Sequence, residues 1–143
     1  MKRICLLLWI PLLLFSCAAP LRIDYVQGRS PIEGLSVTVK SEWPEGEQDL
    51  ALSFQNSTEK TFFLRGEVGV YRWSDEVARS CRRKGEAPCT VSGSIPCGES
   101  EISLNLSGQD LSRSGLYELQ IPVQMDADGE AETYVFILMI AIS

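Results

Sequence analysis

The fold class is decided by two short stretches of the sequence, Leu35-Ser36-Val37-Thr38-Val39 and Leu50-Ala51-Leu52-Ser53-Phe54-Gln55. In both, apolar side chains alternate with polar or small ones. Successive side chains of a β-strand point to opposite faces, so this period of two indicates strands with one buried face. Turn-forming residues follow each stretch, at 44–46 and 56–60. Together these signals indicate antiparallel strands joined by turns.

Strand signals continue in both directions along the chain. We expect strands at residues 61–64, 67–73, 102–106, 115–123 and 133–142, and an edge segment at 21–26. In 67–73, Val68, Val70 and Arg72 share one face while Tyr71 and Trp73 take the other, which is typical of a central strand. No stretch repeats apolar residues at helical spacing over the length of a stable helix. The sequence therefore predicts an all-β, antiparallel β-sandwich of about seven or eight strands.

Four features of residues 34–123 carry a resemblance to a known kind of domain. They are the strand 35–39, the strand and turn 50–60, the turn Pro96-Cys97-Gly98-Glu99-Ser100, and the strand Gly115-Leu116-Tyr117-Glu118-Leu119. In these features the chain resembles the bacterial immunoglobulin-like domains of extracytoplasmic proteins. The resemblance implies an immunoglobulin-like sandwich in which the Tyr117 hydroxyl bonds back to the backbone at a corner. The irregular segment 77–97 is not required by that pattern.

The first sixteen residues have the features of a secretory signal peptide. Lys2 and Arg3 give a positive start, residues 4–15 form an apolar core, and the small Ser16 precedes Cys17. The apolar core is too short to cross a bilayer, which takes about 20 residues. We therefore expect this segment to be cleaved.

The end of that segment, Leu14-Phe15-Ser16-Cys17, resembles the lipobox of bacterial lipoproteins. The resemblance implies that the Cys17 thiol receives a diacylglyceryl group and becomes the first mature residue, with fatty acyl chains such as palmitate holding the protein in a membrane. Two or more acyl chains give stable anchoring. No acidic residue follows Cys17 directly, which by analogy directs the protein to the outer membrane if the host is diderm. The alternative is an ordinary signal peptide, cleaved near Ala19, and a freely secreted product.

These readings divide the chain into a signal peptide (1–16), a lipidated N-terminus with tether and edge strand (17–33), and one sandwich domain (34–143). Cleavage before Cys17 leaves 127 of the 143 residues, enough for a single domain. Loss of Lys2 and Arg3 leaves 11 of the 13 basic side chains against 19 acidic ones, a net charge of −8. Such a charge repels nucleic acid, so no nucleic-acid partner is expected. The run Arg82-Arg83-Lys84 is interpreted as a solvated loop.

The residues give no support for catalysis. The chain contains no histidine, which removes the usual general base and the usual zinc ligand. Most carboxylates fall in turns, as at Asp126, Asp128 and Glu130, without the spacing of a calcium loop. We therefore expect a protein that is not an enzyme, with no metal site and no cofactor.

Three cysteines lie in the irregular segment, at Cys81, Cys89 and Cys97. Outside the cytoplasm two of three thiols are expected to join. The spacing allows any pairing, and we favour Cys81 with Cys89 because 82–88 looks like a loop; Cys97 is the alternative partner.

Trp43 is a candidate binding residue, because it stands beside Pro44 in a polar loop where an exposed ring would favour a partner. The leading hypothesis is a lipid-anchored envelope protein that serves as a protein-binding or structural module. The alternative is an inhibitor of a protease or a cell-wall hydrolase acting through the cysteine-containing loop; an exposed, rigid loop would favour it.

Overall fold

The computed structural model describes residues 23–39, 49–125 and 132–142, and within these ranges the chain forms ten β-strands and no helix. The strands are β1 (Ile23–Arg29), β2 (Leu35–Val39), β3 (Asp49–Asn56), β4 (Phe62–Glu67), β5 (Gly69–Ser74), β6 (Val77–Ser80), β7 (Thr90–Ile95), β8 (Gly98–Asn105), β9 (Gly115–Gln124) and β10 (Thr133–Ile142). Every strand pairing is antiparallel. The all-β, antiparallel prediction is confirmed.

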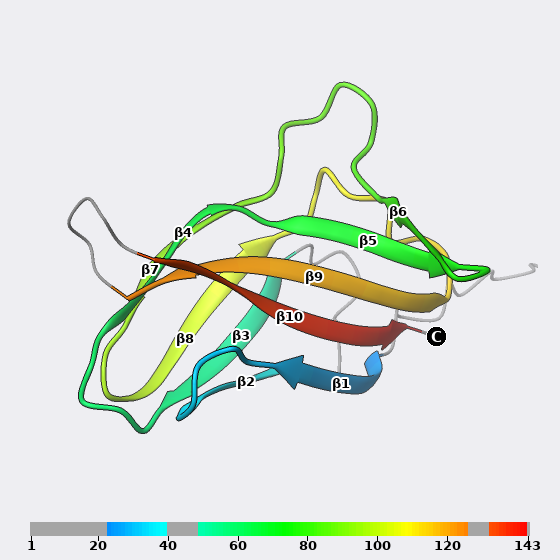
Figure 1. Ribbon diagram of the computed structural model, residues 1–143. Coiled ribbons are helices and arrows are strands. Elements are labelled where there is room, and N and C mark those ends of the chain that lie inside the picture. Colours follow the sequence, from blue (N-terminus) through cyan, green and yellow to red (C-terminus); the bar gives the residue numbers. More distant parts are fainter. Residues whose placement is uncertain (1–22, 40–48, 126–131, 143) are drawn as a thin grey trace, which may run out of the picture.

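The strands form one seven-stranded and one three-stranded sheet (Figure 1). The small sheet has the order β2-β3-β8. In the large sheet, β1 lies at an edge and pairs with β10, which pairs with β9. The other side of β9 is shared, because β4 pairs with its C-terminal end and β5 with its N-terminal half. Beyond these, β7 pairs with β4 and β6 with β5.

The two sheets enclose one apolar core. Phe54 of β3 and Phe136 of β10 meet edge to face, with ring centroids 6.1 Å apart and an interplanar angle of 85°. Both side chains are almost fully buried, as are inward-facing residues of every strand from β2 to β5 and from β7 to β10. This arrangement is consistent with the predicted β-sandwich. Aromatic pairs of this geometry stabilise a core beyond the area that they bury.

The sequence prediction of seven or eight strands missed β6 and β7. The hairpin between β5 and β6 turns at Asp75 and Glu76, which have positive φ angles of 50° and 64°. Two-residue hairpin turns of this kind normally carry Asn-Gly, so the usual signal was absent. In β7 the inward position between Val91 and Ile95 is Gly93, where a Cβ would come within 2.9 Å of Ile102. The alternation is therefore interrupted by a glycine that close packing requires.

The prediction that residues 67–73 occupy a central place in a sheet is confirmed. The stretch is divided at Val68 into the end of β4 and the start of β5, and it lies between β9 on one side and β6 and β7 on the other. Val68 and Val70 are buried on the core side, while Trp73 is among the exposed large apolar residues.

Two polar contacts fix the corners of the fold. The Tyr117 hydroxyl donates to the carbonyl of Arg113 at 2.5 Å, the backbone bond expected of this residue. The buried Asn56 donates from Nδ2 to the carbonyls of Lys60 (2.7 Å) and Ile95 (3.2 Å), and its Oδ1 accepts from the N–H of Thr58 at 2.9 Å. The Tyr117 bond holds the segment before β9, and the Asn56 bonds hold the turn between β3 and β4.

Candidate functional site

The candidate site is built around residues 82–88, here called the cysteine loop, which connect β6 to β7 between Cys81 and Cys89. All seven residues of the loop are exposed. In Figure 1 the loop forms the green arch that projects from the large sheet. It is therefore the longest uninterrupted run of exposed residues in the segment 77–97.

Both ends of the loop are held by the same strand edge. The N–H of Cys81 donates to the carbonyl of Val70 at 3.0 Å, and the N–H of Val68 donates to the carbonyl of Cys89 at 2.7 Å. The pairing of β6 with β5 and of β7 with β4 therefore continues through the cysteines, which lie opposite Val70 and Val68. Both cysteine side chains are buried in the core. The seven residues of the loop therefore leave and rejoin the sheet at points that lie opposite Val70 and Val68, two positions apart along the chain.

The segment after β8 supports the loop from one side. The N–H of Arg83 donates to the carbonyl of Gly108 at 2.9 Å, and the N–H of Asp110 donates to the carbonyl of Cys81 at 2.7 Å. Gly108 approaches so closely that a Cβ there would lie 3.1 Å from the carbonyl oxygen of Ala87. The loop is thus exposed at its surface but fixed at its base.

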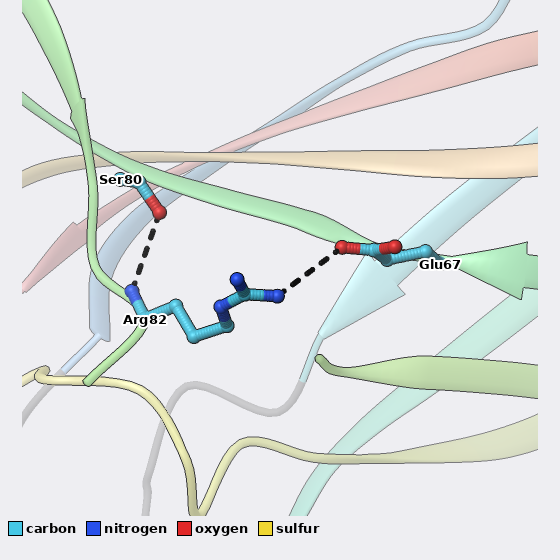
Figure 2. A network of polar contacts seen from close by, with 3 residues as sticks. All are labelled: Glu67, Ser80 and Arg82. Atoms are coloured by element: carbon cyan, nitrogen blue, oxygen red, sulfur yellow. Dashed lines mark hydrogen bonds and ion pairs between the residues drawn. The ribbon is translucent and has the colours of Figure 1, made fainter. Parts of the chain in front are cut away.

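Arg82 leaves the base of the loop and extends toward β4, as Figure 2 shows. Its Nη1 lies 3.8 Å from Oε1 of Glu67, and its N–H donates to the Ser80 hydroxyl at 3.4 Å. Both charged side chains are largely exposed, so this ion pair contributes little to stability. Its effect is to direct the Arg82 guanidinium along the rim of the sheet, beside a hollow of about 210 Å³.

A second hollow, of about 300 Å³, adjoins the base of the loop. Its charged lining residues are Arg72, Arg79, Arg82, Arg83, Arg113 and Asp110, and we call it the arginine hollow. Tyr117 and Cys81 also reach its wall. Five arginines line this hollow against one aspartate, which makes it a strongly positive region on a chain whose net charge is −6.

The three cysteines of the described residues are free thiols in the structure. Burial raises the pKa of the Cys81 thiol, and the negative charge of Asp110 raises it further, while Arg72 opposes them. Burial alone raises the pKa of Cys89. Cys97 is exposed in the turn between β7 and β8. Pairing of Cys81 with Cys89, or of either with Cys97, stays a prediction.

Two of the residues predicted from the sequence, Cys17 and Trp43, lie outside the described residues, as do Asp126, Asp128 and Glu130. Within the described ranges no three Cys, Asp or Glu side chains gather as a metal site would require. The arginine hollow was not predicted. The sequence held two signals of it. Arg72 shares a face with Val68 and Val70, and a charged residue on an apolar face needs an explanation. The run Arg82-Arg83-Lys84, interpreted as a solvated loop, is exposed as expected, but Arg82 and Arg83 also line the hollow.

Comparison with known protein families, curated proteins and solved structures finds no match. Among the described residues, no helix has the length and apolar character needed to cross a membrane.

Proposed function

We propose that this chain is a non-enzymatic, lipid-anchored envelope protein that binds a protein partner through its cysteine loop. The observation that carries the proposal is the loop itself: seven exposed residues whose two ends are fixed to Val68 and Val70, two positions apart along the chain. Binding residues are often placed on loops that a rigid scaffold holds in position. A loop already ordered before binding loses less conformational entropy when the complex forms.

Lipid attachment at Cys17 supplies the location. The support is the resemblance of Leu14-Phe15-Ser16-Cys17 to a lipobox, which implies anchoring at the outer face of a membrane, the outer membrane in a diderm host. Intact mass of the native protein from its host's membrane fraction tests this. We expect the mass of the chain from Cys17 plus acyl chains, and release of a Cys17→Ser variant from the membrane. An unmodified mass starting beyond Cys17 would overturn the anchor.

We also propose that the two-sheet fold is immunoglobulin-like. The support is the hydrogen bond from the Tyr117 hydroxyl to the carbonyl of Arg113, which has the form of the tyrosine corner of such domains. The segment 77–97 adds β6, the cysteine loop and β7 to that pattern.

Partner binding is tested by placing a photo-crosslinking residue at Lys84 in the cysteine loop, with Glu59 in the exposed β3–β4 turn as the matched control. We expect an adduct specific to Lys84. The captured protein, once purified, should bind the wild-type chain and not a chain whose residues 82–88 are replaced by a Gly-Ser linker of equal length. Identical adducts from both positions, or unchanged binding after loop replacement, would overturn the proposal.

A second candidate function is inhibition of a protease or a cell-wall hydrolase. The exposed loop with its fixed base is the feature that the sequence analysis expected of an inhibitor, since inhibitors of hydrolases present a rigid loop to the enzyme's cleft. A binding module would use the same loop, so the loop supports both functions. The two functions are separated by the activity of the captured partner. Loss of that partner's hydrolytic activity on addition of the chain, restored by loop replacement, would favour the inhibitor; unchanged activity would favour the binding module.

A further inference from the structure

Two arginines face each other across the hairpin of β5 and β6. The register pairs Arg72 directly with Arg79, and across the neighbouring strand Arg72 pairs with the buried Tyr117. Residues opposite each other in an antiparallel pair have Cβ atoms about 5 Å apart, and like charges in these positions destabilise the pair. This arrangement therefore favours a negative group that lies between or beside the two guanidinium groups.

The remaining walls of the arginine hollow do not supply that negative group. Asp110 is the single carboxylate among the described lining residues, against five arginines. Its Oδ1 already accepts from the Ser112 hydroxyl at 2.6 Å and from the Ser112 N–H at 3.2 Å. Arg82 in turn is directed away toward Glu67. The hydrogen bonds from Ser112, and then the charges of Arg83 and Arg113, lower the pKa of Asp110, so its carboxylate offsets part of the charge of those two arginines. The positive charges of Arg72 and Arg79 are left in excess.

The Arg72 side chain also has a buried hydrogen-bond donor without an acceptor in the part of the chain that the structure describes. One of its terminal nitrogens, Nη2, donates to the carbonyl of Ser114 at 3.1 Å, but its buried Nε has no hydrogen-bond acceptor among the described residues. The guanidinium lies close over Gly115, where a Cβ would come within 3.1 Å of Nε. Buried donors are rarely left without an acceptor in native proteins, and such a group needs an explanation such as an absent ion. Because Nη2 already donates to Ser114, an oxyanion beside the guanidinium would provide the acceptor that Nε lacks.

We propose that the arginine hollow binds the phosphate group of a small molecule. Arginine forks match the oxygens of phosphate in a bidentate manner. A hollow of about 300 Å³ accommodates a compact group of this kind. An extended polyanion is disfavoured, because the net charge of the chain repels it at long range. Arg82 and Arg83 belong to both the cysteine loop and this hollow. Phosphate binding is nevertheless measured without a protein partner, so failure of one proposal leaves the other standing.

The test is a calorimetric titration of the full chain with inorganic phosphate. Chloride keeps the ionic strength constant. We expect saturable binding to one site. Arg79→Gln should weaken binding by about tenfold or more, the loss of a charge-assisted contact. Arg65→Gln, at an exposed position of β4 away from the hollow, removes the same charge and should leave binding unchanged. Arg113→Gln serves as a second hollow variant if Arg79→Gln fails to fold.

Asp110→Asn provides a change of opposite sign. Its amide oxygen can still accept from Ser112, while the resident negative charge is lost, so phosphate should bind more tightly. Absence of saturable binding, or equal weakening by Arg79→Gln and Arg65→Gln, would overturn the proposal. Glycerol phosphate in place of inorganic phosphate separates the two sources: tighter binding of the ester assigns the site to an esterified phosphate, and tighter binding of inorganic phosphate assigns it to the free ion.

Discussion

Cys81 and Cys89 lie side by side on the core face of the large sheet, opposite Val70 and Val68 of one strand edge. Each residue of a strand advances the chain by about 3.3 Å, so two positions along this edge span about 6.6 Å. Disulfides join cysteines whose Cα atoms are about 4.4 to 6.8 Å apart. The pairing that the sequence predicts is therefore compatible with the register of the strands.

The first prediction is that oxidation joins Cys81 to Cys89. Their thiols lose two protons and two electrons to the disulfide of an oxidoreductase or of oxidised glutathione, and Cys97 remains free. Peptide mass mapping without reduction checks the linkage. Closing a loop of this length should contribute about 2 to 3 kcal/mol to the free energy of unfolding. Cys97→Ser should leave the linked peptide unchanged, and a linkage that contains Cys97 would contradict the prediction.

The second prediction concerns the reduced protein. Cys97 is exposed and should be alkylated first, while Cys81 and Cys89 react slowly because they are buried and their thiol pKa values are raised. A thiol whose pKa is higher in the folded state stabilises the fold below its unfolded pKa, and this stability is lost as the pH rises through the folded value. Unfolding of the reduced chain by urea should therefore become easier above the ordinary pKa range of a thiol. In a Cys81→Ser, Cys89→Ser double variant, the free energy of unfolding should not show this fall at high pH.

The third prediction tests the corner at Tyr117. Tyr117→Phe removes the hydroxyl that donates to the carbonyl of Arg113 and leaves that oxygen without this donor. The free energy of unfolding should fall by about 1 to 2 kcal/mol. Tyr71→Phe is the matched control, because the Tyr71 hydroxyl donates no hydrogen bond within the described residues, and its effect should stay below about 0.5 kcal/mol. Equal effects in urea unfolding would show that the corner bond is unimportant.

The fourth prediction compares two asparagines in similar turns. Asn56 is buried and bonds to Lys60, Ile95 and Thr58, so Asn56→Ala should destabilise the fold by about 2 to 4 kcal/mol. Asn105 makes a comparable contact to Ser107 but is exposed, so Asn105→Ala should cost less than about 1 kcal/mol. Thermal unfolding of the two variants measures the difference, and a larger loss at Asn105 would contradict it.

The fifth prediction concerns the β5–β6 turn. Glu76 has a φ of 64°, which a residue with a Cβ adopts at a cost. Glu76→Gly should raise the free energy of unfolding by about 0.5 to 1 kcal/mol. Glu86→Gly provides the control, because Glu86 is exposed and does not have a positive φ, so it should gain nothing. Calorimetry measures the change, and a lower stability of Glu76→Gly would contradict the prediction.

The sequence predicted those parts of the fold that depend on local alternation. The pattern of β2 and β3, and the shared face of Val68, Val70 and Arg72, follow from a period of two and were found without knowledge of pairing. The face of Arg79 could not be found in this way, because its position opposite Arg72 depends on a turn of two acidic residues. Register is set by that turn, and a shift of one residue would place Arg79 on the other face.

The candidate site was predictable only in part. The cysteines and the loop between them were visible in the sequence, and their spacing alone left every pairing open. The arginine hollow combines residues from β5, β6, the cysteine loop and the segment before β9, which are up to 41 positions apart between Arg72 and Arg113. Such a cluster exists only after the strands have paired, so the local patterns at Arg72 and at 82–84 do not indicate that these residues come together.

The position of β10 between β1 and β9 has a consequence for the order of folding. The first strand described has its sole sheet partner in the last, more than a hundred residues away along the chain. Contacts of such long sequence separation form late, because the closure of a long loop must come first. A chain that emerges with its N-terminus first, at synthesis or at export, therefore has no partner for β1, and none for one edge of β9, until residues 133–142 arrive. During that interval it is vulnerable to aggregation and to proteolysis.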